Sequence, residues 1–262
     1  SRKHIETFYD TKDIGTFPER LKPLSFHCPL TPRTDVIDFN AIFNQLSLLK
    51  LAVYAPVGYI LPSRLKKYEA MYDTEVPSGA GKFKQIDREK SLQALMTVNL
   101  LKRLESSVAA FRLTLQSLHN KHQQALDKIT AFKKSGRADS FTDLTASFED
   151  ADFDGDTLPG FDDTDGSGDV GDNSTGGKVK IDLGDMDLPS WEYDLGADLA
   201  VIDGLLAEMA KITPADDAKL QHLKAQIEHK LAHPINPGNR KLLIFTAFAD
   251  TANYLFEHLA AD

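Results

Sequence analysis

Residues 87–136, DREKSLQALMTVNLLKRLESSVAAFRLTLQSLHNKHQQALDKITAFKKSG, decide the fold. The stretch has no proline, and its only glycine is its last residue, so nothing in it interrupts a helix. Asp87 suits the first turn, and Gly136 suits the left-handed end of the helix. Apolar residues recur at alternating spacings of three and four, which predicts one stripe along a helix. This seam comprises Leu101, Leu104, Val108, Phe111, Leu115, Leu118, His122, Ala125, Ile129 and Phe132.

One continuous helix over 87–136 would be about 70 Å long at 1.5 Å per residue. That length exceeds the width of a compact domain of this size, so we expect the helix to project as one arm of a helical hairpin. The partner arm is predicted at 194–211, where leucines and isoleucines also recur with helical spacing. The predicted fold class is therefore mostly α with minor β.

Length and composition narrow the class of protein further. The chain has 262 residues, enough for a substantial core, and no apolar run reaches the roughly 18 residues of a membrane span. The single cysteine, Cys28, excludes an internal disulfide and a cysteine zinc cage. The chain begins at Ser1 without a methionine or a signal-peptide pattern, and we expect a fragment of a cytoplasmic protein without membrane partners.

The net charge of −9 is unevenly distributed. Residues 149–187 carry a net charge of −11, whereas residues 82–134 carry +7. The predicted long helix is thus a cationic rod, and the acidic stretch is too polar and too charged to form a core. We interpret residues 137–178 as a disordered acidic linker.

Two apparent ligand motifs fail on inspection. The loop before the long helix contains Gly81 and Lys82, but a phosphate-binding loop would require glycine at Val76 and a hydroxyl at Phe83. Residues 150–155, DADFDG, imitate the start of a calcium loop, but its twelfth position is Phe161 instead of glutamate. We therefore favour a solvated linker over a calcium site.

The end of the chain predicts an α/β unit. Residues 241–245, KLLIF, form a short apolar run typical of a buried parallel strand, and residues 249–261 predict the helix that follows it. A second strand is predicted at 24–30, LSFHCPL. One strand and one helix do not make a sheet, so we expect the strand at 241–245 to require neighbours from outside the chain.

Residues 239–259, NRKLLIFTAFADTANYLFEHL, resemble the opening strand and helix of the second RecA-like lobe of Swi/Snf-type superfamily-two helicases, the segment called motif IV. Residues 217–227, DAKLQHLKAQI, are similar to the helix that precedes that lobe. At the other end, SRKHIETFY and FPERLKPLSFHCPL resemble the passage that leaves the first lobe. The order of these segments resembles the inter-lobe region of bacterial helicases of this type.

Composition, periodicity and the resemblance together divide the chain into five parts. The resemblance implies the exit from the first lobe, with a short strand, at 1–34, and periodicity predicts a helical region at 35–136. The acidic linker at 137–178 and a helical return arm at 179–233 follow, and an incomplete RecA-like lobe begins at 234–262.

The resemblance also implies a parent enzyme that hydrolyses ATP with magnesium and moves along double-stranded DNA. These 262 residues contain no Walker loop, Asp-Glu box or arginine-finger segment. We therefore expect a non-catalytic fragment that holds no cofactor itself, couples the flanking lobes and contacts DNA. The alternative is a helical scaffold that dimerises or docks a protein partner through its seam.

Four residues are candidates for nucleic-acid binding. Lys102, Arg103 and Arg112 flank the seam and are suited to phosphate contacts, although a solvated helix flank is an alternative for them. Thr246 matches the motif IV hydroxyl, which in the family lies near the DNA backbone; otherwise it simply satisfies a turn. The pairs His119 with His122 and His229 with His233 have helical metal-ligand spacing but lack further ligands, so we assign no metal site.

Overall fold

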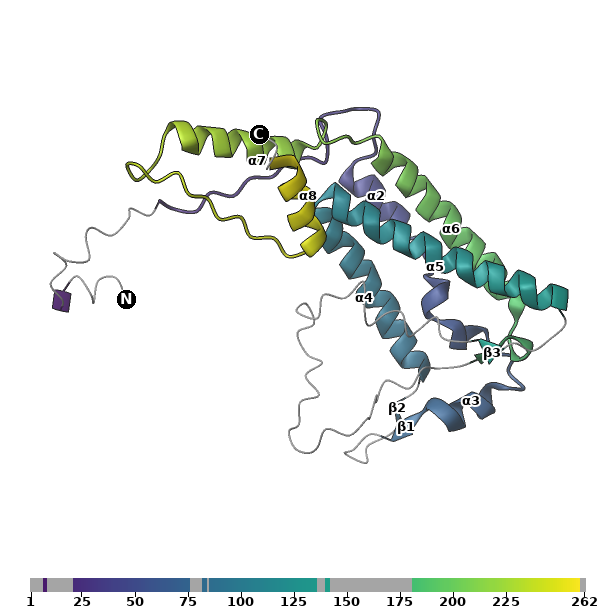
Figure 1. The fold of residues 1–262 in the computed structure, drawn as a ribbon. Helices are drawn as coiled ribbons and strands as arrows, with labels where there is room; N and C mark the ends of the chain where they lie inside the picture. Colours follow the sequence, from purple (N-terminus) through teal and green to yellow (C-terminus); the bar gives the residue numbers. More distant parts are fainter. Residues whose placement is uncertain are drawn as a thin grey trace.

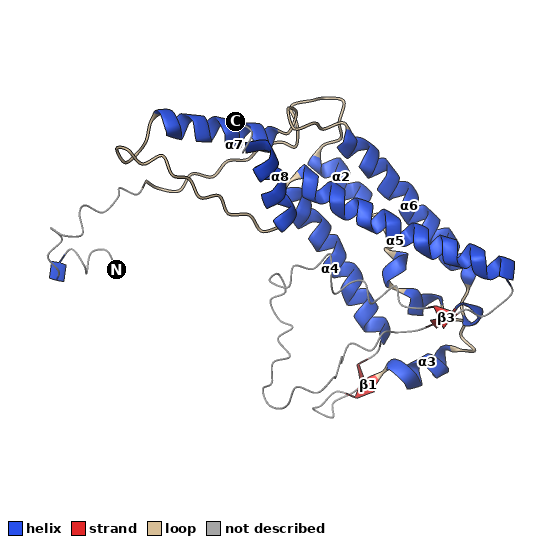
Figure 2. Ribbon diagram, viewed as in Figure 1, coloured by secondary structure: helices blue, strands red, loops and turns tan. Residues whose placement is uncertain are grey.

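The computed structural model describes residues 7–8, 21–75, 82–83, 85–135, 140–141 and 181–259. Helices dominate these residues, which confirms the mostly α class (Figure 1, Figure 2). Within these ranges, no helix combines the length and the apolar character that a membrane crossing requires. The larger helices are α2 (Phe39–Leu46), α3 (Leu65–Tyr72), α4 (Gln85–Ser106), α5 (Val108–Ser135), α6 (Leu188–Ala210), α7 (Ala218–Ala232) and α8 (Ala249–Leu259).

The strands in the described ranges are two residues long and form two separate antiparallel pairs. β1 (Thr74–Glu75) pairs with β2 (Lys82–Phe83), and β3 (Ser140–Phe141) pairs with β4 (Ile181–Asp182). Apart from 140–141, the predicted acidic linker at 137–178 lies outside the described residues, as does the calcium-like motif. Most of the loop that imitates a phosphate-binding loop also lies outside them.

The core lies between α5 and α6, which run antiparallel (Figure 1). Their direction follows from two cross-helix pairs, His122 with Asp198 and Lys133 with Glu192. Every seam residue from Leu104 to Ile129 is buried, and α6 supplies the facing side chains Trp191, Leu195, Ile202, Leu205 and Met209. The seam is therefore covered by the same chain, and a partner that docked through it would have to displace α6.

The predicted continuous helix over 87–136 is wrong at one point. Helical geometry stops at Ser106 and resumes at Val108, and Figure 1 shows that α4 and α5 point in different directions. Ser107 lies between them and its hydroxyl accepts the backbone N–H of Ala110 at 3.0 Å, which makes Ser107 the N-cap of α5. We call this bend the elbow.

A tight loop packs against the other side of α6. At the start of the helical region predicted at 35–136 the helix is short: α2 ends at Leu46, and short 3₁₀ turns follow as η1 (Ala52–Tyr54) and η2 (Pro56–Tyr59). Leu51 has a left-handed backbone, with φ of 51°, although it is not glycine. Such a conformation costs roughly 1–2 kcal/mol and requires support from its surroundings.

The start of α6 is held against α3 by a buried carboxylate. Asp185, in the turn η4 (Leu183–Asp185), accepts hydrogen bonds from Lys67 at 2.7 Å and from the Tyr68 hydroxyl at 2.8 Å. Arg64 lies 3.2 Å from its other oxygen. The hydrogen bond from Lys67, followed by the bond from Tyr68 and the charges of both bases, lowers the pKa of Asp185.

We expect acid to loosen this junction. A carboxylate whose folded pKa is depressed stabilises the fold above its unfolded pKa of about 3.9, and this contribution disappears as the pH falls through the folded value. Asp185→Asn should therefore lower the melting temperature at pH 6 and flatten its decline between pH 5 and 3. Thermal melts followed by circular dichroism test this, with Asp203→Asn on the exposed side of α6 as the control. A wild-type decline that Asp185→Asn leaves equally steep would contradict the prediction.

The two predicted strands are extended segments without ladder partners among the described residues. Neither 24–30 nor 241–245 forms a strand there, and most of their apolar side chains face solvent. Leu243 is 84% exposed and Phe245 is 89% exposed. Both segments lie along α7 (Figure 1), and Leu30, at the end of the first, packs against the helical core.

The ends of the later helices also differ from the predicted ones. α6 begins at Leu188 after the cap Asp187, earlier than the predicted 194. α7 begins at Ala218 because Asp217 caps it by accepting the N–H groups of residues 219 and 220. Leu220 is its buried residue.

Candidate functional site

Five parts of the chain meet at the elbow and line a cavity of about 840 Å³. They are the end of α4 with the start of α5, the extended segment 26–30, Phe39 at the start of α2, the first turns of α7, and residues 244–255, which include the start of α8. Two of the predicted nucleic-acid residues, Lys102 and Thr246, line this cavity. The elbow therefore brings two of the four predicted residues to one cavity.

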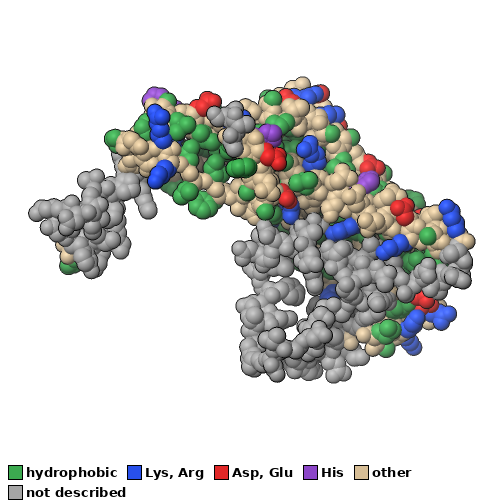
Figure 3. Space-filling model, viewed as in Figure 1, with side chains coloured by type: hydrophobic (Ala, Val, Ile, Leu, Met, Phe, Trp, Pro, Cys, Tyr) green, Lys and Arg blue, Asp and Glu red, His purple; other side chains and the backbone are tan. Residues whose placement is uncertain are grey.

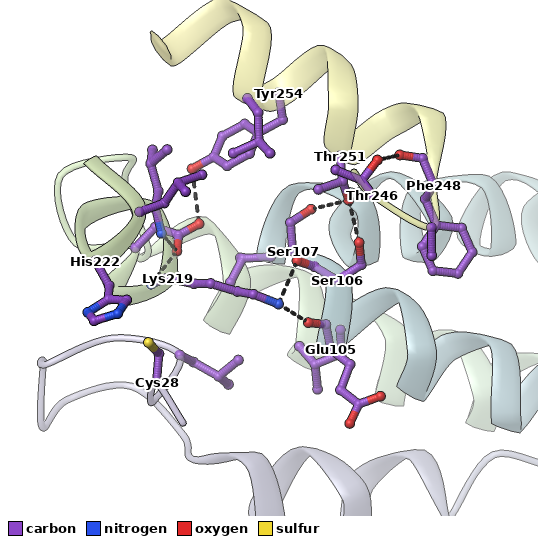
Figure 4. Close-up of a pocket in the computed structure, with 18 of the residues that line it drawn as sticks. Cys28, Glu105, Ser106, Ser107, Lys219, His222, Thr246, Phe248, Thr251 and Tyr254 are labelled. Atoms are coloured by element: carbon purple, nitrogen blue, oxygen red, sulfur yellow. Dashed lines mark hydrogen bonds between the residues drawn. The ribbon is translucent and has the colours of Figure 1, made fainter. Parts of the chain in front are cut away.

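A side chain from α7 bonds to backbone carbonyls of the elbow, and a side chain from α8 bonds to its serine hydroxyls (Figure 4). The Lys219 ammonium donates to the carbonyl oxygens of Glu105 at 2.6 Å and of Ser106 at 3.2 Å. The Thr251 hydroxyl lies 2.7 Å from the Ser106 hydroxyl and 2.9 Å from that of Ser107. These polar groups form hydrogen bonds with one another. Their role is therefore to hold the angle between α4 and α5.

Arg103 does not have the role that its position in the sequence predicts. It is only 5% exposed, forms an ion pair with Asp250 of α8, and its guanidinium lies 4.8 Å from the centre of the Phe248 ring. Because α8 covers it, Arg103 holds the start of α8 against α4 and presents no charge to a phosphate. The prediction that Arg103 contacts nucleic acid is therefore inconsistent with its placement.

Lys102 and Arg112 are exposed on the two sides of the elbow, as a phosphate contact requires. The positive charge of Arg112 acts on the Tyr254 hydroxyl, where it slightly lowers the pKa. That hydroxyl donates to the Asp217 carboxylate at 3.0 Å, and burial, followed by the charge of Asp217, raises the pKa of Tyr254. The same carboxylate caps α7, so Tyr254 ties α8 to the start of α7.

The Thr246 hydroxyl donates to the carbonyl oxygen of Phe248 at 2.9 Å. It thereby satisfies the turn that leads into α8, which is the simpler of the two roles considered for it. Thr246 is half-buried in the wall of the cavity. It can still meet a ligand in the cavity, but only by giving up this bond.

The basic residues of α4 and α5 do not form a continuous stripe. Arg103 and Lys121 are buried, and Lys121 lies over the ring of Tyr54. On the part of the face in Figure 3 that shows described residues, basic side chains lie scattered among acidic ones. The predicted cationic rod is therefore reduced to separate exposed bases, of which Lys102 and Arg112 lie nearest the elbow.

The histidines have structural contacts. His122 is fully buried, its Nδ1 donates to the Leu118 carbonyl oxygen at 2.8 Å, and its Nε2 lies 3.2 Å from Asp198. The rings of His229 and His233 lie 5.0 Å apart on α7. Among the described residues, no group of three or more His, Cys, Asp and Glu side chains is placed to hold a metal ion.

Sequence reasoning missed three residues of the elbow, namely Lys219, Asp250 and Thr251. Each acts on a residue more than 110 positions away in the chain, and no local pattern announces such a contact. Sequence reasoning also missed Asp198, although the sequence contains a signal for it. Asp198 is a carboxylate on the apolar face of the helix predicted at 194–211, and His122 occupies the seam of the partner helix.

Comparisons with protein-family models, with curated proteins and with solved structures found no match to this chain.

Proposed function

We propose that this chain is a non-catalytic connecting module of a Swi/Snf-type, ATP-dependent DNA translocase. In this proposal it joins the two lobes that hydrolyse ATP with magnesium, and it contacts the duplex through exposed bases at the elbow. The resemblance of residues 239–259 and 217–227 to the lobe junction supports the assignment. The covered seam gives less support to the alternative, a scaffold that docks a partner there.

One observation carries the proposal: the segment 241–245 is apolar, extended and unpaired in the described part of the chain. Leu243 and Phe245 are mostly exposed, and the segment ends at the turn that starts α8. Apolar strands of this kind are normally buried in a sheet, and an exposed one is a template for strand pairing. A flanking lobe that supplies neighbouring strands would cover these side chains.

We expect duplex DNA to bind at the elbow through charge. Lys102→Glu with Arg112→Glu should weaken binding at least tenfold and reduce the dependence of the affinity on salt, because two phosphate contacts are lost. Fluorescence anisotropy with a labelled duplex at 50 and 150 mM salt measures both quantities.

Lys66→Glu with Lys134→Glu serves as the matched control, because it changes charge equally on exposed helical positions away from the elbow. If the control pair weakens binding as much as the elbow pair, the contact is not at the elbow. If the chain binds no duplex in a salt-sensitive way, even after removal of residues 142–178, the DNA-contacting role is wrong.

A further inference from the structure

The elbow lies in a stretch whose sequence is compatible both with a straight helix and with a helix start at Ser107. Residues 103–111, RLESSVAAF, contain neither proline nor glycine, and most of them are adequate helix formers. The apolar spacing also continues through it, since Leu101, Leu104, Val108 and Phe111 keep the seam in register. Sharp kinks normally have an identifiable cause: the pair Ser106–Ser107, with Ser107 as the cap of α5, permits this one, and contacts from elsewhere support it.

Lys219 supplies the first contact. In a continuous helix the carbonyls of Glu105 and Ser106 would accept the N–H groups of Ala109 and Ala110. In the structure the Lys219 ammonium takes both carbonyls, and the Ser107 hydroxyl takes the N–H of Ala110. The bent and straight forms thus compete for the same backbone groups.

The start of α8 supplies the second contact. The Thr251 hydroxyl bonds with the last residue of α4 and with the cap of α5, so it touches both sides of the bend (Figure 4). The neighbouring residue, Asp250, pairs with Arg103 one turn earlier on α4. These bonds exist only while α8 is docked at the elbow.

We propose that the elbow is a two-state joint, bent while Lys219 and α8 are docked and straight when they withdraw. Both states satisfy the backbone, because the i to i−4 bonds of a straight helix replace the bonds from Lys219 and Ser107. Helix interruptions that a neighbouring element can close are suited to switching between discrete states. If the proposed function is correct, motion of the second lobe, whose first helix is α8, would redirect α4.

Double electron–electron resonance measures the bend directly. Spin labels at Lys90→Cys on α4 and Gln124→Cys on α5, in a Cys28→Ser background, use two exposed positions on either side of the elbow. A straight helix would separate their backbones by about 50 Å, and the bent form by less. We expect Lys219→Met with Thr251→Val to add a population at the longer distance.

Lys66→Met with Thr130→Val, the same chemical changes at exposed positions outside the elbow, should leave the distances unchanged. Adding Ala109→Pro to the altered elbow should restore the short distance, because a proline is accepted in the first turn of α5 but clashes in a continuous helix. An unchanged short distance in the folded Lys219→Met, Thr251→Val protein overturns the joint, and so does a long population that Ala109→Pro does not remove. The measurement contains no DNA, so its failure is distinguishable from failure of the proposed function.

Discussion

Replacing Asp198 by alanine is expected to lower the free energy of unfolding by about 3 to 5 kcal/mol, because each buried polar group left without its partner costs about 1 to 3 kcal/mol. Asp198 is 1% exposed, and three nitrogen atoms lie within hydrogen-bonding distance of its carboxylate. It accepts the backbone N–H of Lys50 at 2.7 Å and that of Ala52 at 2.8 Å, and it lies 3.2 Å from His122 Nε2. Alanine would leave all three groups without this partner inside the core.

Urea denaturation followed by circular dichroism measures the loss. Asp203→Ala, which removes an exposed carboxylate from the same helix, should cost less than about 1 kcal/mol, although Asp203 also faces a histidine, His119, at 3.3 Å. The contrast isolates burial as the cause, because helix and residue type are the same. Equal losses in the two variants would contradict the assignment of Asp198 as the residue that fixes the loop.

The mostly α fold could be predicted because apolar periodicity is a property of neighbouring residues. The seam from Leu104 to Ile129 has helical spacing, and its residues are buried in the structure. The bend at Ser107 could not be predicted in this way. Ser107 caps α5 locally, but a serine alone does not show whether a helix ends there, and the supporting contacts come from Lys219 and Thr251, more than 100 residues further along the chain.

The candidate site shows the same limit. Lys102 and Arg103 are adjacent and chemically similar in the sequence, yet only Lys102 is exposed. Asp250 and Phe248 make the difference, since they enclose the Arg103 guanidinium at the start of α8. Charge patterns indicate where bases cluster, whereas the packing of a distant helix decides which of them can reach a phosphate.

The predicted strand at 241–245 illustrates a different limit. Apolar composition favours a strand, but a strand also requires a partner for its backbone. The described residues supply none, so the segment stays extended with Leu243 and Phe245 exposed. The preference of a segment for extended structure can be predicted from that segment alone, whereas a hydrogen-bonded strand requires a second segment beside it.

Trp191→Ala is expected to lower the free energy of unfolding by about 3 to 5 kcal/mol, as truncation of a buried aromatic side chain usually does. Trp191 is fully buried in α6, and its indole N–H donates to the carbonyl oxygen of Ala52 at 3.0 Å. Alanine leaves a cavity and removes this donor. Trp191→Phe is the control, because it keeps most of the ring volume and should lose much less stability.

The two largest predicted losses are expected not to add. Asp198 holds the N–H of Ala52 and Trp191 holds its C=O, so both fix the peptide loop in which Leu51 has its left-handed backbone. Once either hydrogen bond to Ala52 is removed, the loop can relax out of the strained conformation of Leu51. Removing the second bond then lowers the free energy of unfolding by less than it would in the wild type. A double-mutant cycle should therefore give a coupling of about 1 kcal/mol or more, whereas strict additivity would show that the two residues stabilise the core independently.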